Sequence, residues 1–106
     1  MGASWEGFVI QQIVRQIGAR SDECYFWATH TGAELDLFVI RCRQRLGFEI
    51  KRTSAPLITP SMRNALADLK LQHLDVIHAG DVTFQMDARI RAVALSRLID
   101  DLQPLR

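Results

Sequence analysis

The chain has 106 residues, of which 48% are hydrophobic and 24% are charged, a composition typical of one folded domain and unlike that of disordered or collagen-like chains. Its 13 basic and 12 acidic residues give a net charge of +1, which is not typical of a protein that coats nucleic acid. No apolar stretch approaches the ~20 residues of a membrane-spanning helix, and residues 1–6 lack the basic start of a secretory signal, so we expect a cytoplasmic protein without membrane contact.

A helix and three strands are predicted in the first half of the chain. Apolar residues recur at spacings of three and four from Ala3 to Gly18, which is typical of a largely buried helix. Ser4 is the expected N-cap, and Gly18 is the expected stop because glycine tolerates the left-handed conformation. The three strands are predicted over residues 24–29, 34–41 and 45–51.

In the second half of the chain, a helix is followed by strands and a short tail. Two prolines between Thr53 and Pro60 interrupt the pattern. A helix over 61–71, a strand over 73–78, short strands near 82–86 and 90–94, and a helix over 95–102 are then predicted. The strands on either side of the first of these helices are expected to be parallel neighbours joined by a right-handed crossover. The order helix, three strands, helix, strand is typical of the α/β class with a mixed central sheet flanked by helices.

The strands over 34–41 and 45–51 alternate between apolar and polar residues, which predicts a core face and a polar face. The expected core face holds Leu35, Leu37, Val39, Leu46, Phe48 and Ile50. The expected polar face holds Glu34, Asp36, Glu49 and Lys51.

The polar face brings two acids and a lysine together across a hairpin. If the hairpin closes about Cys42 and Arg43, Asp36 faces Glu49 at a Cβ separation of about 4.5 to 5.5 Å. Lys51, two residues after Glu49, points to the same side. Two carboxylates at this distance repel by roughly 3 kcal/mol at an effective dielectric of about 20. A divalent cation or Lys51 must therefore neutralise them.

This arrangement suits metal-dependent hydrolysis of a phosphodiester. Asp36 and Glu49 would hold Mg²⁺ or Mn²⁺, and the ion would polarise the phosphoryl oxygen and activate a water. Lys51 would position that water and stabilise the developing charge. The main-chain carbonyl of Ile50 and the carboxylate of Glu6 are candidate further ligands of the metal.

Structural explanations of the same residues stay open. A cross-strand salt bridge between Glu34 and Lys51 on a solvated face would explain part of the pattern without a metal. Glu6, in the first turn of its helix, is favoured there by the helix dipole alone.

Basic residues gather in the middle of the chain. Residues 41–70 hold seven basic and two acidic residues, whereas the rest of the chain is net acidic. This pattern indicates either a solvated face or a surface that contacts phosphates, for which Arg45, Arg52 and Arg63 are the candidate DNA contacts.

The order of the elements, together with Glu6, Asp36 and Glu49-Ile50-Lys51, resembles the PD-(D/E)XK nuclease superfamily. More narrowly, four segments are similar to the uncharacterised C-terminal domain found behind AAA-type ATPase modules in many prokaryotic proteins. They are Trp5-Glu6-Gly7-Phe8-Val9, Phe26-Trp27-Ala28-Thr29, Gly32-Ala33-Glu34-Leu35-Asp36 and Glu49-Ile50-Lys51-Arg52. Leu35 stands where the motif has proline, a departure that leaves the carboxylate in place.

The resemblance implies a restriction-endonuclease-like core, with Asp36, Glu49 and Lys51 at the metal and lysine positions and Glu6 as the helix-borne acid. It also implies an upstream ATPase domain as a partner, so we expect that the chain is a part or a remnant of a longer protein, because it contains no Gly-rich phosphate loop. The leading hypothesis is a metal-dependent nuclease-like domain acting on DNA. The alternatives are a catalytically silent module that regulates the ATPase or forms a homodimer, and an interaction domain unrelated to phosphates.

Overall fold

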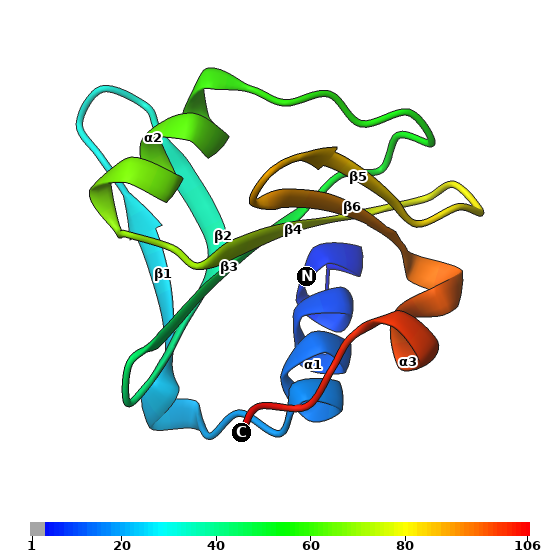
Figure 1. The fold of residues 1–106 in the computed structure, drawn as a ribbon, viewed down its shortest axis with the longest axis horizontal. Helices are drawn as coiled ribbons and strands as arrows, with labels where there is room; N and C mark the ends of the chain where they lie inside the picture. The colour runs from blue at the N-terminus through cyan, green and yellow to red at the C-terminus, as the bar shows by residue number, and fades with distance from the viewer. Residues whose placement is uncertain (1–3) are drawn as a thin grey trace.

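A six-stranded mixed sheet forms the centre of the protein (Figure 1). The structure is a computed structural model, and it describes residues 4–106. The strands are β1 (Cys24–Ala28), β2 (Glu34–Arg41), β3 (Gln44–Ile50), β4 (His73–His78), β5 (Phe84–Asp87) and β6 (Ile90–Ala94). They follow the order β1-β2-β3-β4-β6-β5, in which β3, β4 and β6 are parallel and the other neighbours are antiparallel. The predicted α/β class and mixed sheet are confirmed.

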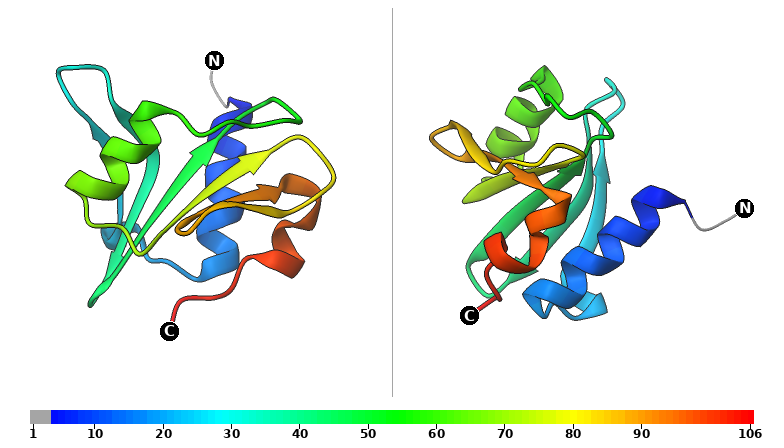
Figure 2. Two further views of the ribbon diagram at one scale, coloured as in Figure 1. Left: turned by 45° about the horizontal axis from the view of Figure 1, so that its top comes forward. Right: turned by 90° about the vertical axis from the view of Figure 1, so that its right-hand side faces the viewer.

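Helices cover both faces of this sheet (Figure 2). The helices are α1 (Trp5–Ile17), α2 (Pro60–Asp68) and the short α3 (Leu98–Asp101), and two 3-10 turns, η1 (Ser21–Glu23) and η2 (Leu95–Arg97), precede β1 and α3. α1 and α3 share one face, and α2 covers the other. No helix within residues 4–106 combines the length and the apolar character needed to cross a membrane.

The first helix has the predicted caps. The hydroxyl of Ser4 accepts a hydrogen bond from the backbone N–H of Gly7 at 2.9 Å, and Gly18 ends the helix with a φ of 73°. The helix begins at Trp5, and Ala3, the predicted start, lies outside the described residues. A serine before the first turn and a left-handed glycine after the last satisfy backbone groups that the helix itself leaves unpaired.

The hairpin between β2 and β3 has the predicted register. Leu37 pairs with Phe48, and Arg41 pairs with Gln44, so the chain reverses at Cys42 and Arg43. The later elements also follow the predicted order, because β4 lies parallel to β3 and occupies the predicted residues. The predicted helix over 95–102 is instead a 3-10 turn followed by the single turn of α3.

The sheet has a separate hydrophobic core on each face. The α1-side core contains Val9, Ile13, Ile17, Leu37, Val39, Phe48, Ile50, Ile77, Val93, Leu98 and Leu102. The α2-side core contains Leu35, Phe38, Met62, Ala65, Leu66, Leu69, Leu71, Leu74, Val76 and Ile90. The expectation of one core face and one polar face for β2 and β3 was therefore wrong in part, because α2 covers the second face.

Leu35 packs on the opposite face from the one predicted. Two steps along β1, from Tyr25 to Trp27, match three steps along β2, from Phe38 to Leu35. This irregularity inserts one extra residue into β2, and an extra residue reverses the side to which the following side chains point. Leu35 consequently joins the α2-side core, whereas Leu37 stays in the α1-side core.

A buried ion pair joins the end of α1 to the sheet. The guanidinium of Arg41 donates to both carboxylate oxygens of Glu23, at 2.8 and 2.9 Å, and to the carbonyl of Gly18 at 2.9 Å. The Arg41 guanidinium and the backbone N–H of Arg20 lower the pKa of Glu23 to about 2. This junction fixes η1 against β2.

Gly47 on β3 is closely packed against the side chains of Leu71 and Leu35. A Cβ at this position would lie 2.6 Å from Cδ1 of Leu71 and 3.0 Å from Cδ2 of Leu35, both of which are buried. We expect Gly47→Ala to lower the free energy of unfolding by about 1–3 kcal/mol because the core cannot expand without strain, as measured by urea denaturation. As a control, Leu71→Val in the same background should recover part of this loss. Additive effects of the two substitutions would contradict the packing explanation.

Candidate functional site

The carboxylate of Asp36 lies where β2 and β3 part. The backbone pairing of these strands ends at Leu37, and beyond it Oδ2 of Asp36 accepts a hydrogen bond from the backbone N–H of Ile50 at 2.8 Å. The N–H of Lys51 donates to the carbonyl of Ile77 on β4, so the N–H and C=O of Ile50 point towards β2. The side chain of Asp36 thus takes the place that a strand carbonyl would occupy.

Glu49 is buried beside Asp36, on the face of the sheet that α2 covers. It lies opposite Val76 of the α2-side core and is only 6% exposed. Burial, a hydrogen bond to Asp36 and the charge of Asp36 raise the pKa of Glu49 to about 9, and the charge of Lys51 opposes this shift. This shift favours the protonated form of the Glu49 carboxyl beside Asp36.

Lys51 adds a positive charge at the end of β3, where its side chain is half-buried. Within the described part of the chain, no salt bridge joins Lys51 to Glu34, so the cross-strand ion pair that was left open is not formed. The backbone of Glu34 instead bonds the hydroxyl of Ser61 on α2, which accepts from its N–H at 2.9 Å and donates to its carbonyl at 3.0 Å. The structure thus brings together Asp36, Glu49 and Lys51.

Glu6 lies apart from these three residues. Its side chain is exposed in the first turn of α1, and α1 packs on the face of the sheet opposite to the one where Glu49 is buried. Among residues 4–106, no group of three or more His, Cys, Asp or Glu side chains is arranged to hold a metal ion. The position of Glu6 agrees with the helix-dipole explanation.

The three candidate DNA contacts have different surroundings. The guanidinium of Arg52 stacks 4.8 Å above the ring of Trp5, directly after Lys51 in the chain. Arg45 donates to the carbonyl of Leu69 at 2.6 Å and lies over the ring of Phe38. Arg63, on α2, forms a salt bridge with Asp87. Of these three arginines, only Arg52 directly follows Lys51. Its side chain forms no hydrogen bond within the described residues.

The oxygens at this site are of the kind that Mg²⁺ and Mn²⁺ prefer. Asp36 and Glu49 supply carboxylate oxygens, and the carbonyl of Ile50 points to the same edge of β3. A divalent cation held by Asp36 and Glu49 would offset the repulsion between their carboxyl groups, and its binding would release a proton from Glu49. The donors therefore fit a cation held by few protein ligands, as is usual for Mg²⁺, which keeps several waters.

Two charged residues inside buried strands were missed by the sequence analysis. Arg91 on β6 donates to both carboxylate oxygens of Asp75 on β4, at 3.3 and 3.2 Å, and the two residues are register partners. They line a pocket of about 1150 Å³ at the end of the sheet opposite to the acid pair. The sequence contained a signal for both, because each charged residue stands between two apolar neighbours in its strand.

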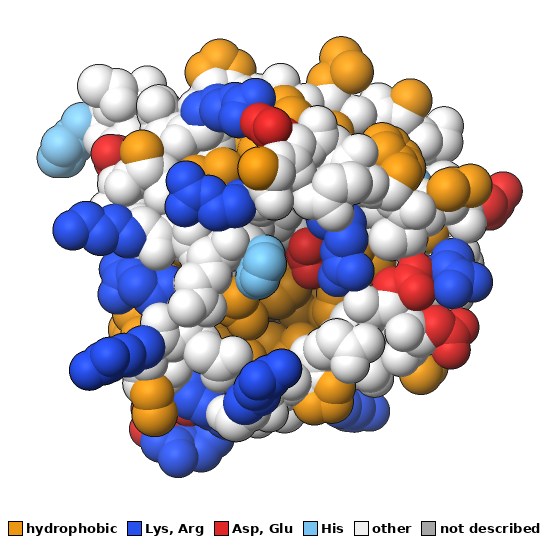
Figure 3. Space-filling model, in the orientation of Figure 1, with side chains coloured by type: hydrophobic (Ala, Val, Ile, Leu, Met, Phe, Trp, Pro, Cys, Tyr) orange, Lys and Arg blue, Asp and Glu red, His pale blue; other side chains and the backbone are white. Residues whose placement is uncertain are grey.

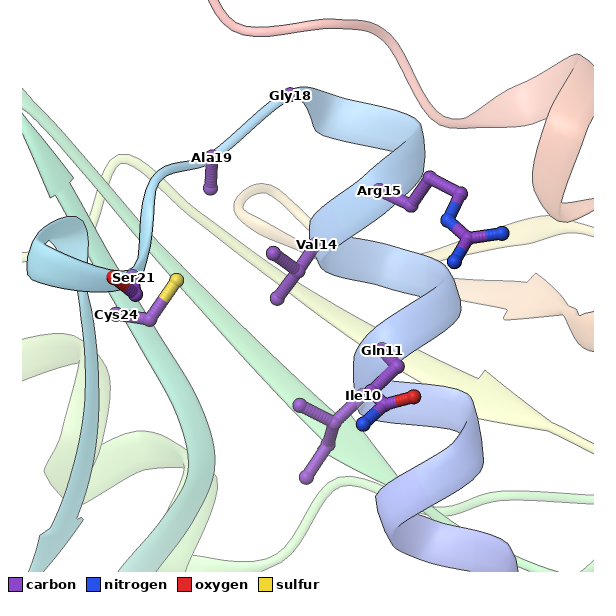
Figure 4. A pocket seen from close by; sticks show the side chains of 8 residues that line it. All are labelled: Ile10, Gln11, Val14, Arg15, Gly18, Ala19, Ser21 and Cys24. Carbon is purple, nitrogen blue, oxygen red and sulfur yellow. The ribbon is translucent and has the colours of Figure 1, made fainter.

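A shallower pocket lies between the end of α1 and the start of β1 (Figure 4). The side chains of Ile10, Val14 and Ala19 and the sulfur of Cys24 face this space, whereas the side chain of Arg15 points away from it. Burial raises the pKa of the Cys24 thiol, and the thiol donates to the carbonyl of Arg20 at 3.3 Å. Cys24 is therefore not an activated nucleophile.

Comparison with known proteins relates the chain to a family and to two mycobacterial proteins. Residues 1–98 match the family described as "Domain of unknown function (DUF4143)". The uncharacterized proteins Rv2008c of Mycobacterium tuberculosis and Mb2031c of Mycobacterium bovis are each 41% identical to the chain over 99 residues. This match covers 93% of the chain but 22% of each relative, so the chain spans about a fifth of the length of these relatives. No solved structure matches the chain significantly.

The raised pKa of Glu49 predicts how stability depends on pH in the absence of metal. Between its ordinary pKa of 4.5 and the folded value of about 9, the folded state binds more protons than the unfolded state. The free energy of unfolding should therefore fall as the pH rises through this range, by up to about 1.4 kcal/mol per pH unit. Urea denaturation in EDTA at a series of pH values measures this slope.

Glu49→Gln should flatten this profile. Glu34→Gln, a neighbouring acid outside the pair, should change it only slightly, because the charge of Glu34 is the smallest of the causes that raise the pKa of Glu49. Some slope will remain in Glu49→Gln, because burial also raises the pKa of Asp75. If wild type and Glu49→Gln gave parallel profiles between pH 5 and 9, Glu49 would not hold the proton.

Proposed function

The chain belongs to this DUF4143 family, and we propose that it is a metal-dependent nuclease-like domain of the PD-(D/E)XK superfamily that hydrolyses phosphodiesters in DNA. The observation that carries this proposal is the acid pair of half-buried Asp36 and buried Glu49 where β2 and β3 part, with Lys51 beside it. A nuclease site needs carboxylates that hold a divalent cation. It also needs a positively charged side chain, in addition to that cation, near the reacting phosphate. These residues supply both.

The energetic state of the acid pair supports a cation-binding role. Glu49 is nearly inaccessible, and its pKa is raised to about 9, so leaving it ionised next to Asp36 costs free energy in the folded protein. Mg²⁺ or Mn²⁺ would be held by these two carboxylates and by the carbonyl of Ile50. When bound, such an ion polarises a phosphoryl oxygen and makes a water more acidic.

Three side chains, those of Asp36, Lys51 and Arg52, would position the metal, the attacking water and the DNA backbone. Asp36 keeps its carboxylate fixed by accepting from the N–H of Ile50 at 2.8 Å, which orients its other oxygen. The ammonium of Lys51 would orient the attacking water and stabilise the charge that develops on the phosphate. Arg52, exposed next in the chain and stacked on Trp5, would hold a neighbouring phosphate of the DNA backbone.

A second candidate function is a catalytically silent module that binds or regulates an ATPase domain within a longer protein. It is favoured by the separation of Glu6 from the acid pair, because within residues 4–106 no third His, Cys, Asp or Glu side chain completes a metal-binding group there. It is also favoured by the edge strand β1, where Tyr25 and Phe26 are 49% and 67% exposed. An exposed aromatic edge of this kind suits pairing with a second copy of the chain.

Metal binding tests the premise of the nuclease proposal, which is a divalent-cation site at Asp36 and Glu49. Isothermal calorimetry with Mn²⁺ at pH 7.5 should show one site per chain, with the release of about one proton because Glu49 is protonated beforehand. The proton appears as a dependence of the measured enthalpy on the ionisation enthalpy of the buffer. Glu49→Gln and Asp36→Asn should abolish uptake, and Glu34→Gln should retain it. Equal Mn²⁺ uptake in all four proteins would contradict a site at this pair.

Cleavage of supercoiled plasmid separates the nuclease from the silent module. With Mn²⁺, wild type should nick the plasmid, and Lys51→Ala should nick it about 10²-fold more slowly while keeping Mn²⁺ affinity, because Lys51 acts on the water and the phosphate. Glu34→Gln is the matched control and should cleave normally. Normal Mn²⁺ binding without cleavage by any protein would favour the second candidate. Equal cleavage by wild type and Lys51→Ala would exclude the proposed site.

A further inference from the structure

A pocket of about 1150 Å³ opens at the end of the sheet opposite to the acid pair. It lies between the turn that joins β2 and β3, the start of β4, the turn that joins β5 and β6, and the last residues of the chain. Figure 3 shows this hollow near the centre of the molecular surface, with hydrophobic side chains in its depth and with Lys or Arg, His and Asp or Glu side chains at its edge. None of the residues assigned to the nuclease-like site lines it.

The floor of this pocket is aliphatic. Ile17, Leu46, Leu102 and Leu105 line it together with Phe48. Phe48 is only 3% exposed, so its ring is not free to stack on a planar ligand. A floor of this composition favours a flexible apolar chain over a nucleotide base, since bases are held by open aromatic faces.

The rim of the pocket carries positive charge. Arg43 and Arg89 project from the two turns on either side of the opening, and both are exposed. Among the described residues neither forms a salt bridge, whereas the acidic side chain in the lining, Asp75, accepts from Nε and Nη2 of Arg91. Nη1 of Arg89 donates to the carbonyl of Leu71 at 3.2 Å, which anchors this side chain beside the opening. The guanidinium of Arg43 and the remaining N–H groups of the Arg89 guanidinium are thus left for an anion above an apolar floor.

We propose that this pocket binds a small organic anion with an aliphatic body, whose carboxylate or phosphate head lies between Arg43 and Arg89 and whose chain covers Leu46 and Leu105, the half-buried residues of the floor. Charge complementarity carries this assignment, because guanidinium groups bind oxyanions bidentately and strongly. Burial of the alkyl chain against the floor supplies the apolar contribution. The pocket is independent of the proposed nuclease function, so the two proposals stand or fall separately.

A titration followed by NMR tests this proposal and locates the ligand. The ¹⁵N-labelled chain is titrated with octanoate, octyl phosphate, 1-octanol and inorganic phosphate. Octanoate or octyl phosphate should shift amide resonances in the β2–β3 turn, at the start of β4 and in the β5–β6 turn. The comparison of octanoate with octyl phosphate identifies the preferred head group. Octanol, which lacks the charge, and inorganic phosphate, which lacks the chain, should each bind at least about tenfold more weakly.

Substitution of the rim completes the test. The double variant Arg43→Ala/Arg89→Ala should raise the Kd for the preferred anion by about tenfold or more. Arg15→Ala, an exposed arginine on α1 outside this pocket, is the matched control and should bind as wild type does. The proposal is overturned if octanol binds as tightly as both anions, if the double variant keeps full affinity, if no ligand binds, or if the shifts fall elsewhere.

Discussion

The structure depends on two neighbouring carboxyl groups, those of half-buried Asp36 and buried Glu49, at the point where β2 and β3 part. Asp36 and Glu49 cannot both be ionised there without a counter-charge, and burial together with Asp36 holds the pKa of Glu49 near 9. Asp36 has a second task, because its Oδ2 pairs with the N–H of Ile50 at the point where the backbone ladder stops. The same carboxylate therefore continues the hydrogen bonding between β2 and β3 and supplies one of the two acids of the candidate metal site.

The irregularity in β2 makes this arrangement possible. One extra residue between Leu35 and Phe38 relative to β1 turns Leu35 towards α2. Asp36 is next to this irregularity, and its side chain reaches across to β3 instead of staying in a regular strand pattern. Irregularities of this kind often re-aim a side chain beside a functional site.

Strand β3 connects two chemically distinct ends of the molecule. At its carboxyl end, Glu49 and Lys51 contribute to an acidic, buried cluster on the α2 face. At its amino end, Leu46 and Phe48 contribute to the apolar floor of the basic-rimmed pocket on the α1 face. Both faces of the sheet are covered, so each end of the central strands can present a site without exposing the cores.

The sequence by itself determined the elements and the local register. Ser4 and Gly18 bounded α1, and the hairpin turn at Cys42 and Arg43 placed Asp36 towards Glu49, because caps and two-residue turns depend on neighbouring residues. Only the tertiary structure decided what covers each face. α2 packs on the expected polar face, where Glu49 is buried and Glu34 stays exposed. The irregularity against β1 moves Leu35, and α1 packs on the opposite face from Glu49, which separates Glu6 from it. These outcomes depend on contacts between segments distant in the chain, and periodicity within one segment carries no information about its partner.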